Sequence, residues 1–219
     1  MNRAQLAARI DHTLLRPDAS AGQIRALCDE ALEHGCKAVC VHGSRLPLAV
    51  ERLSGSPVRV ATVAGFPLGA SSTAIKVAEA AWAREAGAGE IDCVLNIGAL
   101  KEGDHAFVLD EIAQVVAAAG EALVKIILET CLLAADEQRA AVELAVKVGA
   151  AFVKTSTGFS SGGATVGDVR RLKEAAGGRI QVKAAGGIRD ARAALALIEA
   201  GADRLGTSRT SAILADLPV

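Results

Sequence analysis

The sequence lacks a large net charge of either sign, because 24 lysines and arginines stand against 25 aspartates and glutamates in 219 residues. This balance argues against nucleic acid or an anionic membrane as a bulk electrostatic partner. The sequence also lacks an apolar run near the ~20 residues that a membrane-spanning helix needs. The first residues carry no apolar signal-peptide core. We therefore expect a cytoplasmic protein with neither a nucleic-acid nor a membrane partner.

Several motifs of known chemistry are missing as well. The five cysteines are odd in number and contain no Cys-x-x-Cys pair, which argues against a disulfide framework and a zinc knuckle. The four histidines are scattered, without a His-Glu-x-x-His motif or close ligand spacing. Neither a Gly-x-Ser-x-Gly motif nor an opening dinucleotide-binding fingerprint occurs. The sequence therefore predicts no metal, no serine nucleophile and no cofactor.

What the sequence does contain is a regular alternation of short apolar runs and longer segments with helical spacing. The predicted strands cover residues 10–15, 38–41, 58–63, 90–96, 123–128, 151–155, 180–184 and 204–207. A short N-terminal helix is predicted at residues 5–8, and further helices at 21–34, 46–53, 73–86, 104–119, 136–148, 165–176, 190–200 and 209–215. Eight strand–helix units favour an α/β fold, a (β/α)8 TIM barrel with one domain over residues 1–219. An open doubly wound sheet is the alternative.

Two lysines stand at the ends of predicted strands. Lys154 closes the sixth apolar run, Lys183 lies in the seventh, and a glycine-containing turn follows each. Burial disfavours the ammonium form of lysine, and a second cation nearby disfavours it further. A neutral lysine amine is a nucleophile towards carbonyl groups. The alternative is that each side chain extends from the strand end into water and keeps its charge.

A third ionisable residue, Asp92, lies inside an otherwise apolar run at residues 90–96. A carboxylate in that position is desolvated unless it is paired, and the two strand-end lysines are natural partners. A nucleophile, a cation and a proton carrier are the groups that imine chemistry needs. A purely structural buried ion pair is the alternative. Other polar residues within or after predicted strands are Asp11, Thr13, Cys40, Thr62, Asn96, Lys125, Glu129, Thr155, Ser156 and Ser208.

Glycine-containing turns follow the last three predicted strands, at residues 157–158, 185–189 and 205–208. The loops after the seventh and eighth strands of such barrels are a recurrent phosphate site. Glycine lets backbone N–H groups approach an oxyanion closely. We therefore expect a phosphorylated small molecule to bind there, with ordinary tight turns as the alternative.

Five stretches of the chain resemble deoxyribose-phosphate aldolase, in order and across nearly the whole length. They are IDHTLL at residues 10–15, EIDCVLNIGAL at 90–100, VKTSTGF at 153–159, VKAAGGIR at 182–189 and RLGTS at 204–208. That family is a metal-free class I aldolase on a TIM barrel. The resemblance implies a carbon–carbon lyase of deoxyribose phosphate catabolism. Its substrate would be 2-deoxy-D-ribose 5-phosphate, its products D-glyceraldehyde 3-phosphate and acetaldehyde, and its assembly a homodimer or homotetramer.

The resemblance also implies roles for individual residues. Lys154 would be the Schiff-base nucleophile, Lys183 the cation that keeps it neutral enough to react, and Asp92 the proton carrier. The positions expected to contact substrate or phosphate are Thr157, Gly158, Gly186, Gly187, Gly206, Ser208, Asp11, Thr13 and Cys40. The chain departs from the family in having Arg209 where small residues are usual. It also has no tyrosine, and so lacks the C-terminal tyrosine of some members.

Two other functions stay open at the level of sequence. A different phospho-sugar barrel, such as an isomerase or a transaldolase-like enzyme, would produce no acetaldehyde. A barrel that binds a phosphorylated metabolite without catalysis would have an unreactive Lys154 and form no covalent adduct.

Overall fold

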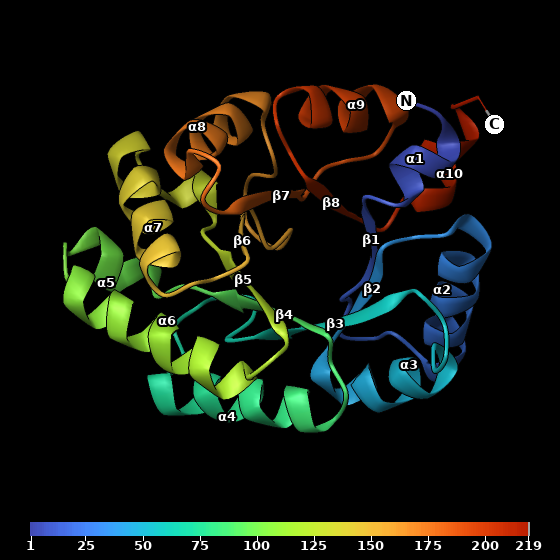
Figure 1. Cartoon of the computed structure of the whole chain (residues 1–219). Coiled ribbons are helices and arrows are strands. Elements are labelled where there is room, and N and C mark those ends of the chain that lie inside the picture. The colour runs from blue at the N-terminus through green and yellow to red at the C-terminus, as the bar shows by residue number, and fades with distance from the viewer. Residues whose placement is uncertain (219) are drawn as a thin grey trace.

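The structure, a computed structural model that describes residues 1–218, is a closed barrel of eight parallel strands that pair in sequence order (Figure 1). The strands are β1 Ile10–Leu14, β2 Ala38–Val41, β3 Arg59–Ala64, β4 Glu90–Val94, β5 Leu123–Ile127, β6 Phe152–Lys154, β7 Gln181–Ala185 and β8 Arg204–Thr207. β8 pairs with β1, with Asp11 opposite Gly206, and this pairing closes the barrel. The predicted TIM barrel is confirmed, and the open sheet is wrong.

Helices surround the barrel on its outer side (Figure 1). They are α1 Arg3–Ala7, α2 Ala21–His34, α3 Leu46–Arg52, α4 Thr73–Glu85, α5 Ile97–Lys101, α6 His105–Ala119, α7 Ala135–Lys147, α8 Val166–Ala176, α9 Ala191–Glu199 and α10 Thr210–Ala215, with short 3-10 turns at Gly43–Arg45 and Thr130–Leu132. None of the helices described is long and apolar enough to cross a membrane. The predicted N-terminal helix is confirmed.

Helix α5 is a departure from the sequence prediction. The strand expected over residues 90–96 ends at Val94, and a helix begins three residues later, at Ile97. The Asn96 side chain accepts a hydrogen bond from the backbone N–H of Ala99, which caps the first turn of α5. The remaining strand and helix boundaries agree with the prediction to within two residues, as is usual for element ends.

The strands are buried on both faces, but the two faces differ in chemistry. On β4, Ile91 and Cys93 belong to the apolar core between barrel and helices. The alternate residues, Glu90 and Asp92, are fully buried and pair with charged side chains from other strands of the barrel. Side chains alternate along a strand, so one set faces the helices and the other the barrel interior. The barrel interior is therefore ionic, whereas such interiors are usually filled by branched apolar side chains.

Candidate active site

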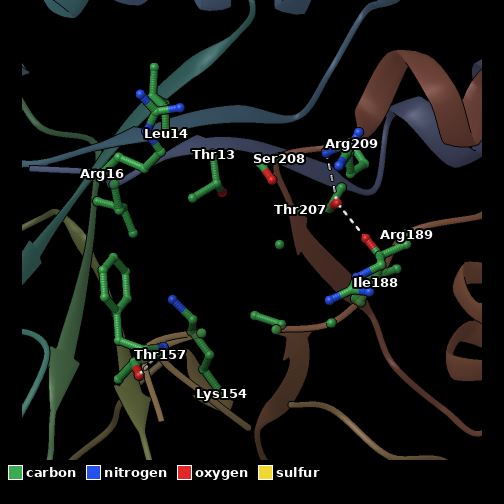
Figure 2. A pocket seen from close by; sticks show the side chains of 17 residues that line it. Thr13, Leu14, Arg16, Lys154, Thr157, Ile188, Arg189, Thr207, Ser208 and Arg209 are labelled. Atoms are coloured by element: carbon green, nitrogen blue, oxygen red, sulfur yellow. Dashed lines mark hydrogen bonds between the residues drawn. The ribbon is translucent and has the colours of Figure 1, made fainter. Parts of the chain in front are cut away.

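A cavity of about 670 Å³ opens beside the carboxyl ends of β1, β6, β7 and β8 (Figure 2). It is lined by Thr13, Leu14, Leu15, Arg16, Lys154, Thr157, Gly158, Phe159, Ala185, Gly186, Gly187, Ile188, Arg189, Gly206, Thr207, Ser208 and Arg209. Among the residues described, the lining includes three arginines and one lysine but no acidic side chain. A cavity with this charge suits an anionic ligand.

Lys154 is the last residue of β6, and its amine points into the cavity (Figure 2). Its Nζ donates a hydrogen bond to Asp92 Oδ2 at 2.9 Å. The side chain is only 3% exposed, so little water competes for the amine. No other lysine of the described chain lines this cavity. Lys154 is therefore the lysine of the pair that a bound molecule can reach.

Lys183 lies opposite Lys154 on the neighbouring strand β7, but outside the cavity lining. Its Nζ donates to Asp92 Oδ2 at 2.8 Å and also to Asp11 Oδ2. Burial by itself lowers the pKa of Lys183, but the carboxylates of Asp11 and Asp92 more than offset this and raise the pKa above its ordinary value. Lys183 is therefore a fixed cation beside Lys154.

Asp92 is the residue that joins the lysines. It accepts hydrogen bonds from Lys125 at 2.6 Å, Lys154 at 2.9 Å and Lys183 at 2.8 Å. Burial raises the pKa of the Asp92 carboxyl, but the three lysines, led by Lys125, bring it well below its ordinary value. Asp92 is therefore an anion that can accept a proton and return it.

The glycine turns after β6, β7 and β8 meet at one side of the cavity. Gly158, Gly186 and Gly187 all have positive φ and line the cavity. Ser208 also lines the cavity. Gly206 has a further structural reason to be glycine, because a Cβ there would lie 3.1 Å from Cε of Lys183. Arg189 and Arg209 stand at the same side of the cavity (Figure 2). The residues predicted for phosphate binding are thus brought together.

The chain matches aldolases over nearly its whole length. A family profile described as "DeoC/LacD family aldolase" matches residues 6–212. The chain belongs to the DeoC/LacD aldolase family. This confirms the family predicted from the motifs, and the matched region contains both lysines and Asp92.

Similar members of the DeoC/LacD aldolase family come from bacteria and archaea. Deoxyribose-phosphate aldolase of Carboxydothermus hydrogenoformans is 51% identical over 99% of this chain and 97% of its own. That of Thermococcus gammatolerans is 55% identical over 93% of this chain and 92% of its own. Among solved structures, the tetrameric deoxyribose phosphate aldolase of Aeropyrum pernix superposes with a TM-score of 0.88 at 34% identity, covering 97% of this chain and 91% of that one.

In this DeoC/LacD aldolase, four further charged residues extend the cluster deeper into the barrel. Lys125 on β5 lies 2.7 Å from Glu90 Oε2. Arg204 on β8 donates to Asp11 Oδ1 at 2.5 Å and to Glu90 Oε1 at 3.1 Å. Sequence reasoning assigned Asp11 to substrate contact and gave the other three residues no role. The available signal was the spacing of Glu90 and Asp92, since residues i and i+2 of a strand share a face.

Two other predicted contact residues of the aldolase have their hydroxyl groups engaged within the protein, and a third, Cys40, is buried. Thr13 lines the cavity, but its hydroxyl donates to the backbone oxygen of Asp11 at 2.8 Å. Thr157 also lines the cavity, and its hydroxyl donates to Glu129. Cys40 is fully buried, and burial raises the pKa of its thiol to about 11.

Neither Cys40 nor Asp11 is among the residues that line the cavity of the aldolase. Asp11 instead pairs with Lys183 and Arg204, so its contacts support it as a holder of the Lys183 cation. No group of three or more His, Cys, Asp and Glu side chains within residues 1–218 is arranged to hold a metal ion. The absence of a metal and of a cofactor from the reaction stays a prediction.

Proposed function

We propose that this aldolase cleaves 2-deoxy-D-ribose 5-phosphate reversibly to D-glyceraldehyde 3-phosphate and acetaldehyde, through an imine on Lys154. One observation carries the proposal. The lysine that reaches the cavity is hydrogen-bonded to the Asp92 carboxylate and stands beside Lys183, a cation that two carboxylates hold in place. The substrate follows from relatives named deoxyribose-phosphate aldolase that are about half identical to this chain.

The reaction begins when the neutral amine of Lys154 attacks the aldehyde carbon of the open-chain sugar. Loss of water gives a protonated imine, which withdraws electrons from the neighbouring carbon. The bond between C2 and C3 then breaks as the C3 hydroxyl loses its proton. C3 leaves as the aldehyde of glyceraldehyde 3-phosphate, and the two-carbon fragment remains as an enamine. Protonation of the enamine and hydrolysis of the resulting imine release acetaldehyde and restore Lys154.

Asp92 and Lys183 have different parts in these steps. Asp92 is a carboxylate 2.9 Å from the Lys154 amine, so it is placed to move protons to and from the reacting atoms, with water as an intermediary. Lys183 is the nearby cation that disfavours a second positive charge on Lys154. Lys183 touches no cavity surface, so we assign it an electrostatic part and assign Lys154 the covalent part.

The phosphate would bind at the opposite side of the cavity from the covalent step. Backbone N–H groups of the turns at Gly158, Gly186 and Gly187 are available there, together with Ser208. Arg209 adds a cation where the family usually has a small residue. Binding of a group far from the reacting carbons holds the aldehyde in place for attack.

Reductive trapping tests the covalent step. The purified chain is incubated with 2-deoxyribose 5-phosphate, reduced with borohydride, digested and analysed by peptide mass, while acetaldehyde is measured without reductant. We expect acetaldehyde release and a reduced two-carbon adduct on Lys154. Lys154→Met should abolish both. Lys101→Met, which removes a half-exposed lysine on α5, is the matched control and should retain both.

Each other result has a definite meaning. An adduct on a lysine other than Lys154 contradicts the mechanism. An isomerised sugar phosphate without acetaldehyde indicates an isomerase-like barrel. Binding of the sugar phosphate with neither adduct nor turnover indicates a binding protein.

We also propose that the chain assembles as a homodimer or homotetramer. The relative from Aeropyrum pernix is described as tetrameric. Leu68, Ile75 and Trp82, in the loop before α4 and on α4, are 76%, 53% and 44% exposed, which is unusual for large apolar side chains. Light scattering of the purified chain would measure the state. The cytoplasmic location and the single domain over residues 1–219 stay predictions.

A further inference from the structure

The charges inside the barrel form a closed ring that extends from the reacting groups to the starts of the strands. Going round, negative and positive residues alternate in the order Asp92, Lys125, Glu90, Arg204, Asp11, Lys183 and back to Asp92. Every member is 5% exposed or less. Lys154 contacts this ring through Asp92. Among the described residues that line the cavity, Lys154 is the one charged residue that forms an ion pair with the ring.

Glu90 and Arg204 are the ring members at the beginnings of their strands, and neither lines the cavity. Glu90 Oε1 accepts a hydrogen bond from Arg204 at 3.1 Å. Glu90 Oε2 lies 2.7 Å from Lys125 Nζ but makes no directed hydrogen bond with any residue in 1–218, so charge holds this contact. Arg59, which is about half exposed, approaches Glu90 at 3.6 Å and links the ring to solvent.

The ring is electrically balanced, and Lys154 is not part of that balance. Three carboxylates face three cations, so a protonated Lys154 would leave one positive charge in excess. Charges in a dry interior act on one another over long distances because water does not screen them. Of the other inward groups, Cys40 on β2 keeps its proton, since burial raises its thiol pKa to about 11, and Thr62 on β3 has no charge to change.

We propose that Glu90 and Arg204 are positioning residues for the reaction: they close the ring that fixes Asp92 and Lys183, and they set the net charge that Lys154 experiences. They act through other residues, since the cavity contains neither of them. The inference rests on the imine mechanism proposed above.

Two substitutions of opposite sign test it. Glu90→Gln removes an anion, leaves the ring positive and makes the Lys154 ammonium less favourable. Arg204→Gln removes a cation and does the reverse. The acidic limb of the pH dependence of imine formation should therefore move to lower pH in Glu90→Gln and to higher pH in Arg204→Gln. Each shift should be on the order of one pH unit, which is a tenfold change in rate on that limb. The double variant restores the balance and should return the limb to within a few tenths of a unit of the wild-type position.

The measurement is the rate at which acetaldehyde and cyanoborohydride label Lys154 in the full chain between pH 5 and 9, followed by peptide mass. Glu111→Gln is the matched control, because it neutralises an equally buried carboxylate that pairs with Lys76 outside the barrel interior. Damage to the structure alone would move both ring variants in the same direction. Opposite shifts that the double variant cancels support the inference. Shifts in one direction, or shifts no larger than that of Glu111→Gln, overturn it.

Two further variants keep the test decisive where a single ring variant does not fold. Glu90→Asp keeps the charge and should leave the limb in place, while kcat falls because the shorter side chain holds Lys125 and Arg204 less well. Arg59→Gln removes the half-exposed cation and should move the limb in the same direction as Arg204→Gln, but less. An unmoved limb in Arg59→Gln together with a displaced limb in the double variant overturns the inference. If the wild-type chain forms no Lys154 adduct, the proposed function itself fails. If the adduct forms but its pH dependence is the same in every ring variant, only the inference about the ring is overturned.

Discussion

The structure buries charge in two places, and they differ in charge balance and in access to a cavity. Lys76 of α4 and Glu111 of α6 form an isolated ion pair at 2.6 Å, and both are almost completely buried. The barrel interior has contacts of the same length, between Lys125 and Asp92 for example. The pair between the helices is balanced and lines none of the cavities described. The barrel cluster has one lysine in excess, and that lysine faces a cavity.

The largest effect is expected from removing Lys183, the fixed cation of the barrel interior, because this change tests whether the barrel charges act on Lys154. Lys183→Leu should lower kcat by about a hundredfold to a thousandfold, in the range of groups that assist proton transfer and nucleophile activation. The acidic limb of the pH–rate profile should move to higher pH, since Lys154 loses the neighbour that disfavours its proton. Steady-state kinetics across pH, with circular dichroism to check the fold, measure both. A pH–rate profile identical to that of wild type would contradict the coupling between the two lysines.

The same kind of change between the helices should affect stability and leave the chemistry alone. Glu111→Gln leaves Lys76 buried without its partner and should lower the free energy of unfolding by about 3 kcal/mol. Urea unfolding measures that loss. At 25 °C, kcat/KM should stay within about twofold of wild type, because neither Lys76 nor Glu111 lines the active-site cavity. A large loss of activity in folded Glu111→Gln would show that the two sites are not independent.

A charge in the cavity lining sharpens the comparison, since Arg209 is exposed to solvent, whereas the charges of the barrel interior are buried. Arg209→Ser should raise KM for 2-deoxyribose 5-phosphate about tenfold, the worth of one partly exposed charge-assisted contact. The KM for unphosphorylated 2-deoxyribose should be unchanged, because that sugar has no anion to hold. Arg25→Ser, on the exposed side of α2, serves as control. Equal effects on both sugars would mean that Arg209 does not contact the phosphate.

The smallest expected effect is the response of the barrel to acid. The pKa values of Asp11 and Asp92 are both lowered below the ordinary 3.8, despite burial, by their cationic partners. A carboxyl whose pKa is lower in the folded state contributes stability that is present above its ordinary pKa and is lost as pH falls through the folded value. The free energy of unfolding should therefore be level from about pH 5 to 8 and decline below about pH 4. Urea unfolding at each pH tests this, and a decline that begins near pH 6 would contradict it.

The fold could be predicted from the sequence because its signals are local. Ser20 and Gln23 form the capping box that begins α2, and Gly35 in the left-handed conformation ends it. Helix α5 was missed because five residues that include Gly98 follow a strand almost directly. A segment this short carries too little periodicity to distinguish it from an extended strand.

The site could be predicted only in part, because barrel closure is not a local property. The sequence predicts that Lys154, Lys183 and Asp92 lie together, since each is a charge within or after an apolar run, and in the structure both lysines contact Asp92. Glu90 and Arg204 are the first residues of their strands, and a charged residue at that position is expected to mark the boundary of the strand and to face solvent. Their contact joins strands more than a hundred residues apart, and the stagger of the barrel decides it. Asp11 was assigned to substrate because its pairing with Lys183 across the closing seam is equally non-local.

The alternating ring takes its negative and its positive residues from different halves of the chain. Its carboxylates Asp11 and Glu90, like Asp92, come from β1 and β4, whereas every lysine of the cluster and Arg204 come from β5 to β8. Within the ring itself, the first four strands supply only carboxylates and the last four supply only cations. Each half supplies the counterions that the other half needs before its inward face can leave water. Closure of the barrel therefore brings the carboxylates of β1 and β4 into contact with the cations of β5 to β8.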